Sequence, residues 1–60
     1  MPYNETPTQA EMYYEMALDN LEEGNKGTAR SHLSLARNIA VKNNMTDLIK
    51  KIDALRARLG

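Results

Sequence analysis

Apolar residues recur every three to four positions along most of the chain, which is the spacing of one face of an α-helix. Between positions 7 and 23, one arc holds Tyr13, Ala17, Ala10, Leu21, Tyr14 and Leu18. Between positions 26 and 42, a wider arc holds Leu35, Ile39, His32, Ala36, Ala29, Ala40 and Leu33. Between positions 46 and 59, a narrow stripe holds Leu55, Leu48, Leu59 and Ile52. No stretch alternates with the period of a strand, so the pattern predicts an all-α protein.

Start and stop signals separate the three helical stretches. Thr6-Pro7-Thr8-Gln9 is typical of a helix start, with Thr as the cap and Pro at the first helical position. Gly24-Asn25 and Asn43-Asn44 are typical of helix ends and turns, and Thr46 can cap a third helix. We therefore expect a single domain, residues 1–60, with helices at about 7–23, 26–42 and 46–59 and a flexible lead at 1–5. The short turns predict an antiparallel helical hairpin with a third packed helix.

The first two helices resemble one tetratricopeptide repeat, a helix–turn–helix of about 34 residues with small and large residues at fixed offsets. Ala17 matches the small residue of the first helix, and Gly24-Asn25 matches the turn. The small, large and small positions of the second helix are matched by Ala29, Leu33 and Ala36. The matching region covers about residues 10–43. The whole chain is also similar, more weakly, to the microtubule-interacting-and-trafficking three-helix domain.

The chain departs from the repeat at three points. Tyr13 stands where the family prefers Trp, Asn20 stands where it prefers Tyr, and no Pro closes the second helix. The resemblance implies that the third helix caps the hairpin, as terminal helices do in such arrays. It also implies a concave, ligand-bearing side, toward which Tyr14 and Leu18 would point.

Length and composition exclude several classes of protein. Sixty residues without Cys exclude a multidomain enzyme, a disulfide scaffold and a Cys-based metal site. No apolar run reaches the roughly 20 residues of a membrane span, and no secretory signal is recognisable, so we expect a cytoplasmic protein. A core of this size rarely supplies more than about 3–5 kcal/mol, which favours association with a partner.

Charge is divided unevenly along the chain, although the formal net charge is zero. Residues 1–24 carry six acidic residues and no Lys or Arg, for a charge of −6, whereas residues 25–60 carry eight basic and two acidic residues, for +6. Two interpretations stay open. The acidic first helix could neutralise the basic second helix across their seam, with each exposed pair worth about 0–1 kcal/mol. Alternatively, each charged face meets an oppositely charged partner or a second copy of the chain, as in a homodimer.

The first helix is the predicted binding element. Met12 and Met16 lie on the side away from its apolar arc, where Met side chains either cover the third helix or offer an adaptable contact surface. The predicted partner-binding residues are Met12, Tyr14, Met16, Leu18, Glu11 and Glu22. We expect a non-catalytic protein–protein interaction module, such as an adaptor, a small chaperone-like subunit or an inhibitor.

A small nucleic-acid-associated regulator is the alternative. Its basic face would consist of Lys26, Arg30, Arg37, Lys51 and Arg58. Residues 25–60 contain no aromatic ring except His32, and the net charge is zero, so nucleic-acid binding is disfavoured. No metal, cofactor or enzymatic activity is expected: His32 has no second ligand in the pattern, and the paired carboxylates lie on a helix face without a pocket.

Overall fold

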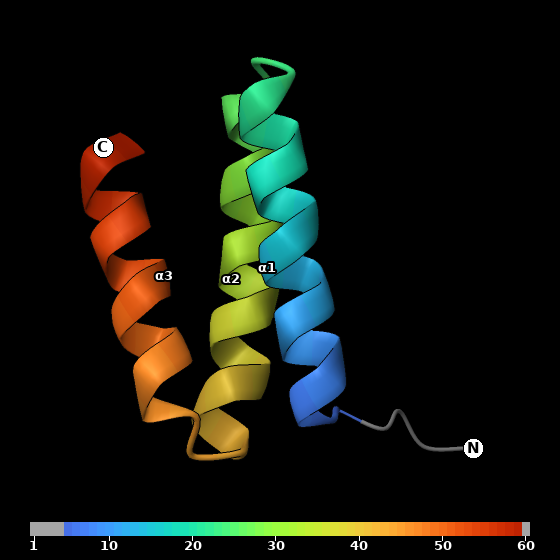
Figure 1. Cartoon of the computed structure of the whole chain (residues 1–60), viewed down its shortest axis with the longest axis vertical. Helices are drawn as coiled ribbons and strands as arrows, with labels where there is room; N and C mark the ends of the chain where they lie inside the picture. The colour runs from blue at the N-terminus through green and yellow to red at the C-terminus, as the bar shows by residue number, and fades with distance from the viewer. Residues whose placement is uncertain (1–4, 60) are drawn as a thin grey trace.

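Three helices make up the computed structural model, which describes residues 5–59 (Figure 1). They are α1 (Pro7–Glu22), α2 (Lys26–Lys42) and α3 (Thr46–Leu59). α1 packs antiparallel on α2, and α3 runs back along another side of α2. The predicted all-α hairpin with a third packed helix is confirmed. Among the described residues there is no strand and no helix with the length and apolarity needed to cross a membrane.

Both turns use the same hydrogen-bonding motif. After α1, the N–H of Asn25 donates to the Asn20 carbonyl (2.8 Å) and that of Gly24 to the Leu21 carbonyl (3.0 Å). After α2, the N–H of Met45 donates to Ala40 (2.9 Å) and that of Asn44 to Val41 (3.2 Å). These paired bonds define a Schellman motif, which requires a left-handed residue after the cap. Gly24 (φ 84°) and Asn44 (φ 56°) supply it, and each turn therefore reverses the chain within three residues.

The helix bounds differ little from the predicted ones. Pro7 opens α1, and the Thr6 hydroxyl accepts the Gln9 N–H at 3.2 Å, as the cap pattern predicts. α1 ends at Glu22 rather than residue 23, because Glu23 is already the capping residue. Thr46 is the first residue of α3 instead of the cap before it.

Two glycines provide a matched pair of substitutions. A Cβ added at Gly24 or Gly27 meets no atom within 4 Å, so only the backbone decides the outcome. Gly24→Ala places an L side chain at φ 84° and should lower the free energy of unfolding by about 1–2 kcal/mol. Gly27→Ala lies in the first turn of α2 and should raise it by about 0.5–1 kcal/mol. Urea titrations of both variants test this, and shifts of the same sign would contradict it.

The core is centred on α2, which contributes five of the nine buried apolar residues. They are Ala29, Leu33, Ala36, Ile39 and Ala40 from α2, Ala10 and Ala17 from α1, and Leu48 and Ile52 from α3. Both buried residues of α1 are alanines, which lets α1 approach α2 closely. For one member of the apolar arc predicted for α2, burial in the core is wrong: Leu35 is 45% exposed.

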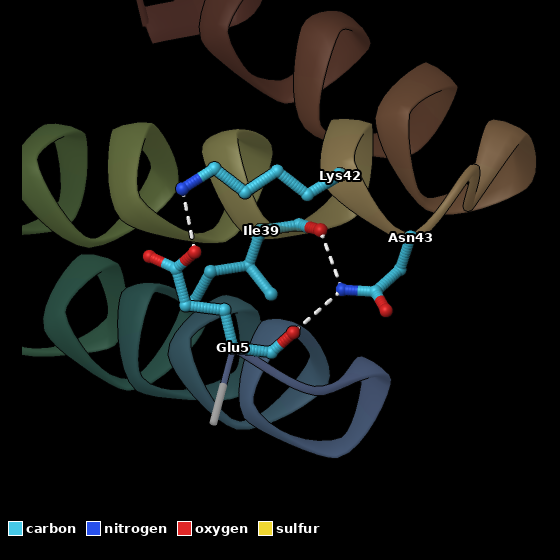
Figure 2. Close-up of polar contacts among 4 residues, drawn as sticks. All are labelled: Glu5, Ile39, Lys42 and Asn43. Carbon is cyan, nitrogen blue, oxygen red and sulfur yellow. Dashed lines mark hydrogen bonds and ion pairs between the residues drawn. The ribbon is translucent and has the colours of Figure 1, made fainter. Parts of the chain in front are cut away.

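The chain enters α1 beside the end of α2 (Figure 2). The Glu5 carboxylate pairs with the Lys42 ammonium, and the Asn43 side-chain amide donates to the Glu5 carbonyl (2.8 Å) and the Ile39 carbonyl (2.9 Å). Glu5, placed by the sequence in the flexible lead, therefore has two contacts with the end of α2. The other residues of the predicted lead, 1–4, lie outside the described part of the chain.

Candidate protein-binding groove

A groove with a volume of about 920 Å³ runs between α1 and α3. It exists because both helices pack on α2 and have few contacts with each other. The α1 wall consists of Thr8, Glu11, Met12, Tyr14 and Glu15; the opposite wall consists of Asn44, Met45, Thr46, Asp47, Leu48 and Lys51. Apolar side chains from both walls, Met12, Tyr14, Met45 and Leu48, form its lining, and the charged side chains are exposed along its edges.

The structure brings together three of the six predicted partner-binding residues. Glu11, Met12 and Tyr14 line the groove. Met16 and Leu18 lie one turn further along α1, so they continue this side of the helix beyond the groove. Glu22 is exposed at the last residue of α1.

The two methionines of α1 both keep a large exposed surface. Met12 is 48% exposed and Met16 is 38% exposed. The exposed surface agrees with an adaptable contact surface, and Met12 also lines the groove together with residues of α3, so both roles that the sequence leaves open stay predictions.

The acidic residues of α1 are not neutralised by α2. Glu11, Glu15 and Asp19 follow one another at four-residue spacing, Glu23 continues the row, and all four are exposed. The described residues contain two ion pairs, Arg37–Asp53 and Lys42–Glu5, and neither involves a residue of α1. The charges of α1 therefore face solvent. Of the acidic residues in positions 1–24, Glu5 pairs with α2, at Lys42, so pairing across the seam applies to Glu5 and not to α1.

A polar contact joins the helices inside the seam instead. His32 Nδ1 lies 2.6 Å from Asn20 Oδ1, and the Tyr13 ring stacks on the imidazole with centroids 6.0 Å apart and planes at 24°. Since the amide oxygen only accepts, Nδ1 carries the proton. His32 and Asn20 are both half-buried, so this histidine is a packing residue. No group of three His, Asp or Glu side chains in the described range is arranged to hold a metal ion.

The predicted basic face is split between two sides of α3. Lys51 lines the groove with α1, whereas Arg30 lines a separate hollow of about 520 Å³ with Asp53 and Arg56. Arg30 also donates to the Leu59 carbonyl at 3.1 Å, and Arg37 is engaged with Asp53. Lys26 and Arg58 are exposed but line neither hollow.

The Arg37–Asp53 pair predicts a pH effect. Arg37 donates to both carboxylate oxygens of Asp53 (2.8 and 3.2 Å), and this hydrogen bonding holds the pKa of Asp53 below its ordinary value. The stabilisation is therefore present above the unfolded-state pKa and is lost as pH falls through the lower, folded-state pKa. Arg37→Gln should move the NMR titration midpoint of Asp53 to higher pH. An unchanged midpoint would show that the pair does not form.

The family of the chain is not decided by the fold, since three packed helices in this order occur in many proteins. The resemblances to the tetratricopeptide repeat and to the microtubule-interacting-and-trafficking domain therefore stay predictions. No protein-family model, no curated protein and no solved structure matches the chain.

Proposed function

We propose that the protein is a non-catalytic protein-binding module that receives a segment of a partner protein in the groove between α1 and α3. The observation that carries this proposal is the exposure of apolar side chains at the groove between the two helices. Met12 is 48% exposed at the groove, and Met16 continues the same side of α1. Apolar surface gathered at one place and edged by charged residues is typical of interaction sites.

The chemistry of the lining supports a peptide or helix as the ligand. Met12 and Met45 are unbranched and polarizable, so they can adapt to an incoming side chain. Tyr14 is half-buried in the same wall, and Tyr is favoured as an interface anchor. Two facing helices separated by an apolar groove are suited to helix-in-groove recognition. An adaptor, a small chaperone-like subunit and an inhibitor would all use such a surface.

The test is affinity capture with four forms of the full chain, each from nuclease-treated and untreated native lysate and read by quantitative mass spectrometry. The groove variant is Met12→Ala/Tyr14→Ala, and the control is Leu35→Ala/Val41→Ala, which removes apolar groups exposed elsewhere. We expect a partner that the parent and the control recover equally and the groove variant recovers at least about tenfold less, because each interface anchor contributes about 1 kcal/mol or more.

A second groove variant guards against loss of fold. Met12→Gln changes a side chain that is already exposed, and circular dichroism should show the helices unchanged. Equal recovery by the parent, both groove variants and the control would overturn the proposal. Recovery from untreated lysate alone would instead favour the nucleic-acid alternative.

A further inference from the structure

We infer that the segment received by the groove is an amphipathic helix that carries Lys or Arg beside its apolar stripe, and that it belongs to a different protein. This inference rests on the proposed binding function and specifies the chemistry of the partner. It is based on the apolar groove, on the charges at its edges and on their lack of partners within the described part of the chain.

The edges of the groove are predominantly negative. Glu11 and Glu15 lie on the α1 side, and Asp47 and Lys51 lie on the other side. The edges therefore carry three carboxylates and one ammonium group. All four residues are exposed, and neither ion pair found among the described residues involves them. A cationic helix would place opposite charges against these edges, whereas an acidic helix would bring like charges together.

The spacing of the acidic residues fits a helical ligand. Glu11, Glu15 and Asp19 follow one another at four-residue intervals, about 6 Å apart along the helix axis. Lys or Arg residues spaced by four on a partner helix repeat at the same distance. The described residues contain no strand, so the groove offers no sheet edge to which an extended peptide could add.

The same acidic row disfavours α1 in the unbound protein. Like charges four residues apart repel one another, and acidic residues near a helix C-terminus oppose its dipole. α1 has no acidic residue in its first turn and no basic residue in its last turn, where each would be favourable. A basic partner would remove this repulsion, so binding and the relief of a local destabilisation would occur together.

The test is a selection from a displayed library of amphipathic helices of about 20 residues, with flank positions randomised over Lys, Gln and Glu. We expect Lys to be enriched when the parent chain is the bait. Glu11→Lys/Glu15→Lys should reverse the enrichment toward Glu. The matched control is Thr28→Lys/Ser34→Lys/Asn38→Lys/Ala54→Lys, which raises the net charge by the same amount at exposed residues outside the groove. It should keep the preference for Lys. Selected peptides should bind the parent at least about tenfold more tightly than they bind the groove variant, a difference that increased salt should reduce.

The variants must remain folded, and one of them provides an independent readout. Glu15→Lys alone replaces two like-charge neighbours by two opposite-charge pairs, so its melting temperature should rise above that of the parent. If the acidic edge serves binding, Glu15→Lys should bind the selected peptides more weakly than the parent does and should also melt at a higher temperature. A lower melting temperature would contradict the repulsion described for α1.

The possible failures differ in what they overturn. Binders that depend on Met12 but show no enrichment of Lys would overturn the basic partner and leave the proposed groove function intact. Absence of any Met12-dependent binder would overturn both. A concentration-dependent dimer in sedimentation equilibrium that Glu15→Lys abolishes would overturn the assignment to a different protein, because a second copy of the chain would then be the occupant.

Discussion

Leu33→Ala should leave most of the chain unfolded at 25 °C. Leu33 is fully buried and, with Ile52, is one of the two largest such side chains. Truncating a buried Leu to Ala costs about 2–5 kcal/mol, because apolar contacts are lost and a cavity remains. A core of this size supplies only about 3–5 kcal/mol. Circular dichroism at 222 nm and urea titration should therefore show little or no folded baseline for this variant.

Leu35→Ala is the matched control for this prediction. It makes the same chemical change two residues further along α2, at a side chain that is 45% exposed. Its free energy of unfolding should stay within about 1 kcal/mol of the parent value, since little buried area and no enclosed cavity are involved. Similar losses for both variants would show that Leu33 is not the centre of the core.

Ile52→Ala should loosen α3 before it affects the other helices. α3 is fixed mainly by its packing on α2, and Ile52 is its only fully buried residue in the described range. The loss of about 2–5 kcal/mol should therefore appear first in α3. Native-state amide exchange followed by NMR should show protection falling more in residues 46–59 than in α1 and α2.

The control for Ile52 is Lys50→Ala, which truncates an exposed side chain of the same helix. It should leave the exchange pattern unchanged. If Ile52→Ala reduced protection equally in all three helices, α3 would be shown to fold together with the hairpin. Because α3 forms one wall of the groove, selective loosening should also weaken peptide binding while α1 and α2 stay helical.

The helices could be predicted from local signals, because caps and turns act within a few residues. Thr6, Gly24 and Asn44 mark helix ends through their own hydrogen bonds or backbone angles. Which side of α2 is buried could not be predicted in the same way. Leu33 and Leu35 lie about 200° apart around a helix, on nearly opposite sides. Both could be buried only if neighbouring helices surrounded α2. Leu33 is fully buried and Leu35 is 45% exposed, and this difference depends on where α1 and α3 pack around α2.

The sequence predicted residues of only one wall of the candidate groove, the wall formed by α1. Met12, Tyr14 and Glu11 are recognisable because they share a helix and can be placed around its axis. Met45 and Asp47 belong to the opposite wall, and only the position of α3 brings them near α1. The direction in which the carboxylates of α1 point could not be predicted from the sequence either. Opposite net charges on consecutive helices suggest pairing, but alanines occupy the seam and the carboxylates of α1 point outward.

The contact between Asn20 and His32 adds to the turn at Gly24 in favouring one axial register of the hairpin. Buried alanines recur seven residues apart in both helices, at Ala10 and Ala17 and at Ala29 and Ala36. Sliding one helix by seven residues, about 10.5 Å, would place alanine positions beside alanine positions again. Small side chains thus distinguish poorly between the two alignments. The 2.6 Å contact of His32 with Asn20 exists in only one of them, the same one that the short turn between α1 and α2 requires. A half-buried polar pair therefore reinforces, inside the seam, the alignment that the turn sets at one end.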